Sequence, residues 1–137
     1  MVLAQYTFFI YFCRFKGPVP RLIYNMKDLT ELNLAKNSFT GSIPPLIGNL
    51  FKLESIELYT NEFEGEIPSQ LGELTKLKKL ALHNNNLTGT VSPQLCKLVD
   101  ERFLSLISAD CAGESAYIDC SCCQCHSHEN VIHVGGV

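Results

Sequence analysis

Apolar residues in the middle of the chain recur at a constant spacing of 24 positions. Each copy of the pattern runs L-x-x-L-x-L and then contains an asparagine, another apolar residue, a glycine and an aliphatic residue before a proline. The first copy comprises Leu29, Leu32, Leu34, Asn37, Phe39, Gly41, Ile43, Pro44, Ile47 and Leu50. The second copy begins at Leu53 and the third at Leu77, where the proline is displaced by one position to Pro93. A fixed period of this length predicts a right-handed solenoid, because each turn can bury its apolar residues only against its neighbours.

Each L-x-x-L-x-L segment predicts a short strand whose alternate residues point inward, and stacked turns would pair these strands in a parallel sheet. The asparagines at the end of each strand, Asn37, Asn61 and Asn85, can bond the backbone of neighbouring turns as a ladder inside the coil. The Ile-Pro pairs favour an extended backbone. Residues 44–50 and 68–74 follow these pairs and predict single helical turns of the 3₁₀ type.

The same spacing extends toward the N-terminus. Phe8, Ile10 and Cys13 each lie 24 positions before a member of the first copy, with Cys13 at the asparagine position. We therefore interpret this segment as a fourth repeat whose cysteine is buried in the first turn. A secretion leader is disfavoured, because no Lys or Arg precedes the apolar run Met1–Cys13. Such arrays normally begin with a distinct cap, so we expect the chain to be a fragment of a longer array.

The pattern also predicts one strand beyond the third copy. Leu104 and Leu106 lie 24 positions after Leu80 and Leu82, which puts Ala109 at the asparagine position. We expect about five turns, with residues 1–110 forming the array as about four repeats plus a capping strand. A cysteine-rich cap then occupies residues 111–126, and residues 127–137 form a tail without periodicity.

Outward-facing residues of the predicted strands form columns at the same spacing. One column is Thr7, Glu31, Ser55, Lys79 and Phe103; the others are Phe9, Asn33, Glu57, Ala81 and Ser105, then Tyr11, Ala35, Tyr59, His83 and Ile107, then Phe12, Lys36, Thr60, Asn84 and Ser108. Aromatic and charged groups on a rigid face are typical of binding hot spots. The candidate ligand-binding residues are Glu31, Asn33, Glu57, Tyr59, Lys79 and His83. The alternative is an ordinary solvated face whose partner binds elsewhere.

Composition excludes several classes of function. With a net charge of −3 and 18% charged residues, the chain gives no reason to expect nucleic acid or an anionic membrane as a partner. No apolar run approaches the roughly 20 residues that a spanning helix needs. The sequence contains no phosphate-binding loop, no nucleophile elbow and no carboxylate pair with a reason to converge. We expect neither an enzyme nor a cofactor.

The Gly-x-Ile-Pro element adds a family resemblance. From Phe8 to Ile107 the array resembles the plant-type leucine-rich repeats of receptor-like kinase ectodomains, receptor-like proteins and polygalacturonase-inhibiting proteins. The resemblance implies an α/β solenoid of horseshoe shape, with short parallel strands on the concave face and 3₁₀ turns on the convex face. It further implies an extracellular or cell-surface module that binds a protein or peptide ligand on the concave strands. Two alternatives are a hydrolase inhibitor or cell-wall glycan binder, and a structural surface repeat protein without a discrete ligand.

Six cysteines gather at the C-terminal end: Cys96, Cys111, Cys120, Cys122, Cys123 and Cys125. This end resembles the caps of secreted repeat proteins, and the oxidising compartment that the resemblance implies favours disulfides, with 15 pairings open. A zinc site could instead use Cys120, Cys122, Cys123, Cys125, His126 and His128. The spacing C-x-C-C-x-C lacks the two usual zinc knuckles, so we expect no metal. A catalytic pair of Cys125 and His126 is the weakest interpretation, because no third group orients it.

One N-glycosylation sequon, Asn86-Leu87-Thr88, follows the third ladder asparagine. It marks Asn86 as a glycosylation candidate, and the alternative is an unmodified turn residue.

Overall fold

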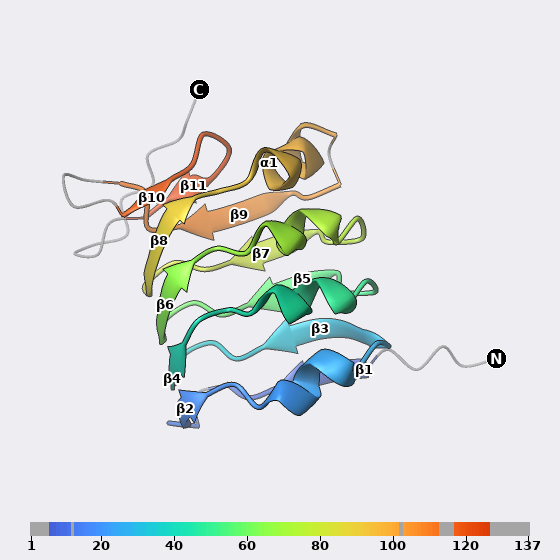
Figure 1. The fold of residues 1–137 in the computed structure, drawn as a ribbon, viewed down its shortest axis with the longest axis vertical. Helices are drawn as coiled ribbons and strands as arrows, with labels where there is room; N and C mark the ends of the chain where they lie inside the picture. Colours follow the sequence, from blue (N-terminus) through green and yellow to red (C-terminus); the bar gives the residue numbers. More distant parts are fainter. Residues whose placement is uncertain (1–5, 12, 102, 113–116, 127–137) are drawn as a thin grey trace.

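The computed structural model describes residues 6–11, 13–101, 103–112 and 117–126. Its turns stack along one axis, and each turn adds a strand to one side of the molecule (Figure 1). These strands form a six-stranded sheet in the order β1-β3-β5-β7-β9-β11, with every neighbouring pair parallel. Their bounds are β1 Tyr6–Phe9, β3 Leu29–Asn33, β5 Ser55–Glu57, β7 Lys79–Ala81, β9 Leu106–Ala109 and β11 Gln124–Cys125.

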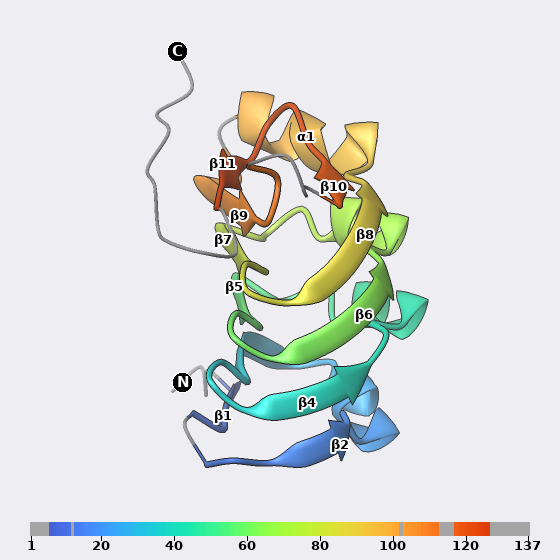
Figure 2. The ribbon, with the colours of Figure 1, turned by 90° about the vertical axis from the view of Figure 1, so that its left-hand side faces the viewer.

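A second parallel sheet covers an adjacent side of the coil (Figure 2), in the order β10-β8-β6-β4-β2. Its strands are β2 Lys16–Pro18, β4 Ser38–Gly41, β6 Glu62–Glu66, β8 Asn86–Thr90 and β10 Ile118–Asp119. The sequence pattern did not predict this sheet, because β4, β6 and β8 each carry one large inward residue and a glycine instead of an alternating run. Phe39 and Phe63 stack inside it with ring centroids 6.3 Å apart. Gly65 has a φ of +80°, which L-residues adopt only with strain.

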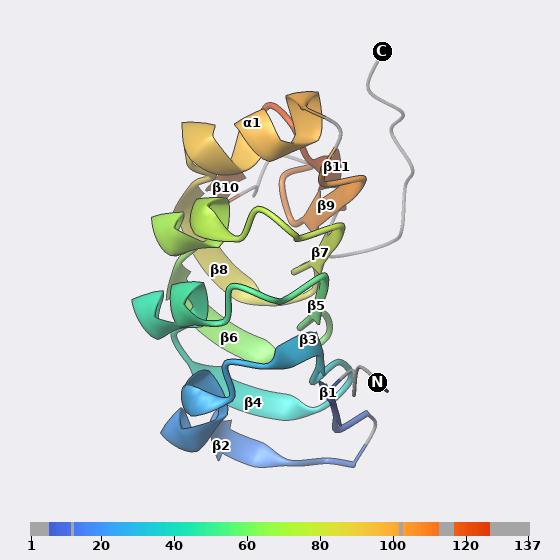
Figure 3. The same cartoon turned by 90° about the vertical axis from the view of Figure 1, so that its right-hand side faces the viewer.

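The helical segments lie on the side opposite the six-stranded sheet (Figure 3). Three are 3₁₀ helices, η1 Arg21–Asn25, η2 Pro45–Asn49 and η3 Ser69–Glu73. The sequence predicts η2 and η3, which lie within the segments 44–50 and 68–74. The fourth, α1 Pro93–Asp100, is an α-helix. The displaced Pro93 occupies its first position, and the Ser92 hydroxyl accepts a bond from the Leu95 backbone N–H at 3.3 Å.

Leucines and isoleucines fill the space between the sheets and the helical segments. Leu29, Leu53 and Leu77, which open the three copies, are all 0% exposed. The predicted asparagine ladder is also present. The Asn85 side-chain N–H groups donate to the carbonyls of Leu58 at 3.0 Å and Leu82 at 2.8 Å, while its oxygen accepts from the Phe63 N–H at 3.1 Å. Each such amide therefore joins its own turn to the preceding one.

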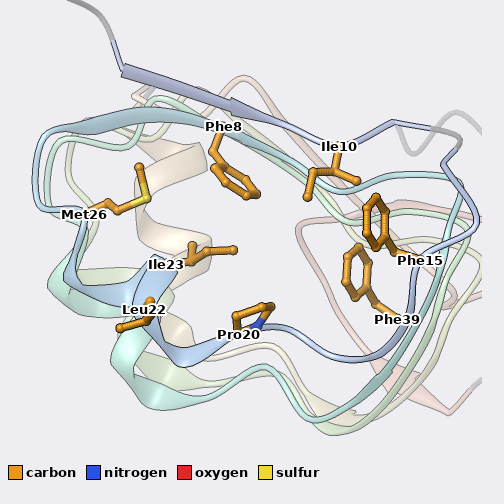
Figure 4. Close-up of a pocket in the computed structure, with 8 residues that line it drawn as sticks. All are labelled: Phe8, Ile10, Phe15, Pro20, Leu22, Ile23, Met26 and Phe39. Atoms are coloured by element: carbon orange, nitrogen blue, oxygen red, sulfur yellow. The ribbon is translucent and has the colours of Figure 1, made fainter.

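The predicted N-terminal repeat is present, with Phe8 paired beside Leu32 in the sheet. Its open end exposes an apolar hollow (Figure 4) lined by Phe8, Ile10, Phe15, Pro20, Leu22, Ile23, Met26 and Phe39. The prediction that Cys13 is buried was wrong, because Cys13 is an exposed free thiol. Among the described residues this first turn has a neighbour on one side only, so nothing covers the position that the asparagines occupy in the interior turns.

The predicted register of β9 was wrong. Leu80 pairs with Ile107 and Lys79 with Leu106, a spacing of 27 and not 24 positions. The cause is α1, which has eight residues where η3 has five and so adds three positions to the turn. Ile107 and Ala109 therefore point inward, and Leu104 takes the place of Leu77. Consequently Phe103, Ser105, Ile107 and Ser108 do not occupy the predicted columns, and Ala109 does not replace an asparagine.

The sheet also has six strands where about five turns were predicted, because β11 adds a strand beyond β9. The division at residues 110 and 126 remains a proposal, and the tail 127–137 and Phe12 lie outside the described residues. Within the described part of the chain, no helix combines the length and apolar character needed to cross a membrane.

Replacing Asn85 with alanine tests the ladder. Asn85→Ala would leave two buried carbonyls and one buried N–H without their partner, so we expect the free energy of unfolding to fall by about 2–4 kcal/mol. Urea denaturation of the full chain measures this. Asn49→Ala, at an exposed position that ends η2, is the control and should change stability by less than about 0.5 kcal/mol. Equal effects of the two substitutions would contradict the ladder's role.

A second prediction concerns backbone strain. Thr60 has a φ of +55°, in the left-handed region that a β-branched residue tolerates poorly, while Asn84 occupies the same position one turn later. Thr60→Asn should therefore raise stability by about 1 kcal/mol. The control Thr75→Asn, in a turn without positive φ, should give no gain. A Thr60→Asn variant no more stable than the native chain in the same denaturation assay would refute this account.

Candidate functional site

The candidate residues lie on the solvent side of the six-stranded sheet, which we call the outer face. Strand alternation places them there, since Glu31 and Asn33 flank the inward Leu32 in β3. The observed pairing puts Glu31, Ser55 and Lys79 in one row, as the sequence predicts. Tyr59 follows β5 by two positions and His83 follows β7 by two, so both side chains point to this face as well.

Four of the six candidate residues form one contiguous cluster. The Lys79 Nζ and Glu57 Oε1 atoms are 2.9 Å apart, and the Glu57 side chain is only 20% exposed. The Tyr59 and His83 rings stack in parallel, with centroids 4.9 Å apart and an angle of 5° between their planes. Glu31 and Asn33 interact away from this cluster, Glu31 with the Thr7 hydroxyl at 3.5 Å and Asn33 with the Ala35 backbone N–H at 3.0 Å.

His126 completes the stack from the other end of the chain. Its ring lies 4.2 Å from that of His83, centroid to centroid, and it is 8% exposed. Its backbone N–H donates to the Ala109 carbonyl at 2.8 Å, immediately after β11. Sequence reasoning assigned His126 only to a zinc or catalytic alternative. Its position depends on the pairing of β11 with β9, for which the 24-residue repeat gives no signal.

Tyr11 and Lys36 extend the cluster toward the first turn. The Lys36 Nζ lies 5.4 Å from the centre of the Tyr11 ring, and its hydrogen bond to the phenol lowers the pKa of Tyr11. Burial raises the pKa of Tyr59, and the neighbouring Tyr11 phenol raises it further. Ala35 lies between Tyr11 and Tyr59 in their column, and its small side chain leaves room for the two phenols to interact. Sequence reasoning placed Tyr11 and Lys36 in the outer columns without choosing them as candidates.

His83 is held in a neutral state. Burial lowers its pKa to about 4, and the adjacent His126 lowers it as well, while the carboxylate of Asp110 acts in the opposite direction. The His83 Nδ1 lies 2.8 Å from the Ser108 hydroxyl oxygen, within hydrogen-bond distance. Lys79 also disfavours the charged imidazolium. The cluster therefore presents a neutral imidazole at both neutral and mildly acidic pH.

The Asp110 carboxylate ends the series of backbone hydrogen bonds that joins the loops after successive strands. In interior turns the backbone N–H groups after each strand donate to the next turn, as Thr60 does to the His83 carbonyl at 3.0 Å. At the last turn the Asp110 carboxylate accepts these bonds, from Asn84 at 2.8 Å and from Asn85 at 3.0 Å. The Asp110 carboxylate thus takes the place of the backbone carbonyls that a further turn would supply as acceptors. These two hydrogen bonds offset the cost of burying its charge, which explains why Asp110 is only 3% exposed.

The structure pairs all six C-terminal cysteines, as the favoured interpretation holds. The disulfides are Cys96–Cys122, Cys111–Cys125 and Cys120–Cys123. Because Cys125 is bonded to Cys111, it offers no thiolate to His126, so the catalytic alternative was wrong. The structure also does not bring together the zinc ligands that the sequence suggested. Cys125 is bonded to Cys111, not to another of those cysteines, and the His126 ring stacks on His83. His128 lies outside the described residues.

Asn86 opens β8 with an exposed side chain, beside a polar hollow formed by Thr60, Asn61, Asn84 and Asn85. This position leaves the amide accessible to a glycosyltransferase. Glycosylation of Asn86 stays a prediction.

Two segments, residues 28–50 and 76–98, match the family model described as Leucine Rich Repeat. The solenoid has the leucine-rich repeat fold. A sequence comparison with curated proteins gives no match.

Several solved leucine-rich repeat structures resemble this one. The plant peptide hormone receptor RGFR1, in complex with RGF2, is 30% identical with a TM-score of 0.72, over 80% of this chain and 17% of that one. The ectodomain of the receptor kinase SOBIR1 from Arabidopsis thaliana is 25% identical with a TM-score of 0.66, over 84% and 67%. A plant ice-binding protein is 27% identical with a TM-score of 0.67, over 83% and 34%. The chain thus spans about a sixth of the receptor RGFR1.

The lowered pKa of His83 predicts a pH-dependent stability. The unfolded imidazole, with a pKa near 6.5, takes up a proton before the folded one does at about 4. Stability should therefore be complete above pH 6.5 and fall as the pH drops toward 4. A shift of this size in a fully buried ring corresponds to about 3 kcal/mol, but this ring is only half-buried, so we expect about 1 kcal/mol after solvent screening.

The variant His83→Phe keeps an aromatic ring in the stack and removes the titration. Denaturation at pH 7 and at pH 4 should show the native chain losing about 1 kcal/mol more than this variant. All other titrating groups are common to both chains, so the difference isolates His83. Parallel losses in the two chains would contradict the prediction.

Proposed function

We propose that the chain is a non-catalytic extracellular module that binds a protein or peptide on its outer face. The observation that carries this proposal is the interlocked cluster of Glu57, Tyr59, Lys79 and His83, held by an ion pair and a ring stack on adjacent strands. Tyrosine is enriched in hot spots, and a preorganised surface loses little entropy when it binds. The likeness to a peptide hormone receptor supports the same conclusion.

The orientation of the rings supports a peptide over a cell-wall glycan. Both faces of His83 are covered, by Tyr59 on one side and His126 on the other. A sugar that stacks on an aromatic side chain needs an open ring face, which the stack offers poorly. The chemistry of the Tyr59 phenol and the His83 imidazole instead matches the N–H and carbonyl groups of a peptide backbone. The Glu57–Lys79 ion pair compensates its own charges, so this part of the face favours no strongly charged ligand.

Two further features bear on the alternatives. The likeness to an ice-binding protein raises the possibility of a surface that binds a lattice, but the row Thr7, Glu31, Ser55 and Lys79 lacks any repeated side chain. The three disulfides support an oxidising compartment, since such bonds persist outside the cytosol. An extracellular location is therefore part of the proposal.

Selection from a peptide display library against the oxidised full-length chain tests the proposal. Binders should be recovered, and Tyr59→Ala should weaken them by about 30-fold, because loss of a hot-spot residue costs about 2 kcal/mol. The control Glu64→Ala removes an exposed side chain from β6 in the other sheet and should change affinity by less than about twofold.

Binders that are insensitive to Tyr59→Ala but lost on changing the second sheet would overturn the assignment of the face. Recovery of no binder from peptide and protein libraries would count against the function itself.

A further inference from the structure

Helix α1 and the segment after β10 lie at the C-terminal end of the solenoid (Figure 2). Four cysteine sulfurs lie close together there, one on α1 and three in that segment. The Sγ atoms of Cys96, Cys120 and Cys122 all lie within 4.8 Å of one another. Cys123 belongs to the same group, because its sulfur is bonded to that of Cys120. All four side chains are partly buried and pack against the core.

The spacing of the Cys96, Cys120 and Cys122 sulfurs is close to that of a thiolate metal site, and Cys123 adjoins them through its bond to Cys120. A zinc ion with four thiolates at about 2.3 Å requires its sulfurs to be about 3.8 Å apart. The Sγ atoms of Cys120 and Cys122, which belong to different disulfides, are already 3.7 Å apart. Reduction would free the bonded sulfurs to separate toward the same spacing.

We propose that these four cysteines bind one zinc ion when the Cys96–Cys122 and Cys120–Cys123 disulfides are reduced. Each disulfide takes up two electrons and two protons and becomes two thiols. Two molecules of a thiol reductant supply both and become a disulfide, whereas a phosphine supplies the electrons and becomes a phosphine oxide, with water giving the oxygen and the two protons. The incoming zinc ion then displaces the four thiol protons to solvent and is held by four thiolates. The step therefore balances with the reductant, water in the case of a phosphine, and zinc.

The site differs from the zinc set that the sequence suggested. Cys96 contributes from α1, 24 positions before Cys120, and no knuckle spacing would identify it. Cys111 and Cys125 lie in the third disulfide, which joins the segment after β9 to β11 and stands apart from the four-sulfur group. That pair supplies a matched control within the same chain.

The metal would join the same two segments that the Cys96–Cys122 disulfide joins. Cys96 lies on the final helix, and the other three cysteines lie in the segment that follows the second sheet. A zinc ion at this point would hold that segment over Leu95 and Leu98, as the disulfides do. The end of the solenoid could then close in reducing as well as oxidising surroundings. This site is separate from the proposed binding face and does not depend on it.

The test uses the full chain, reduced with a phosphine and kept free of oxygen, with Co²⁺ and then Zn²⁺ as probes. We expect one metal ion per chain, the intense visible absorption of tetrahedral four-thiolate cobalt, and displacement of cobalt by zinc. Intact mass under native conditions should show one zinc with four protons lost.

Matched variants distinguish this site from general chelation by a cysteine-rich segment. Cys96→Ser should weaken zinc binding by at least about tenfold and shift the cobalt spectrum toward three thiolates. The double variant Cys111→Ser, Cys125→Ser should keep the native affinity and spectrum. Because zinc binding is itself measured, the comparison does not require the metal-free reduced chain to fold.

Three results would overturn the proposal. One is unchanged affinity in Cys96→Ser, which would mean that residues 120–123 chelate the ion alone. Another is loss of binding in the double variant, which would place the ligands elsewhere. The last is failure of the reduced native chain to bind zinc at all.

Discussion

Each turn of this solenoid buries its leucines against the turns on either side. Neighbouring turns must therefore place apolar residues at equivalent positions within the turn. The asparagine amides depend on the same register, because each one bonds carbonyls of two successive turns. A change in the length of one turn therefore displaces all that follows. The three extra residues of α1 show this directly, since they change which residues of β9 reach the core.

The two ends of the array satisfy this requirement to different degrees. At the first turn no described residue covers the apolar hollow around Phe8 and Ile23, and Cys13 is exposed where the interior turns hold an asparagine amide. At the last turn the longer helix, the Asp110 carboxylate and three disulfides close the coil. Hydrogen bonds and covalent bonds therefore contribute to this closure along with apolar burial. The Asp110 carboxylate accepts the backbone hydrogen bonds that another turn would accept, and the disulfides restrain a C-terminal segment that has little core of its own.

The register that buries the leucines also builds the outer face. Because strands repeat every 24 residues, Tyr59 and His83 stack across neighbouring strands at about the spacing of the strands themselves. His126 joins this stack from the cap, so the chain end that closes the core also contributes to the candidate binding surface. Its presence helps to keep His83 neutral. Core packing, end closure and the chemistry of the face are therefore linked through the last two strands.

The sequence by itself determined the solenoid, the parallel strands, the 3₁₀ segments, the asparagine ladder and the columns that contain Glu57, Tyr59, Lys79 and His83. These features repeat, and a repeated residue at a fixed spacing has one geometric meaning in a stacked coil. Tertiary structure alone decided the second sheet, the shifted register of β9, the bonds of Asp110, the cysteine pairing and the position of His126. The second sheet recurs along the coil, but its short strands lack the alternating run that marks a strand in a sequence. The other four features occur once, or depend on which segments meet at the end of the coil. No local pattern encodes them, because their energy comes from contacts between residues that only the closed end of the fold brings together.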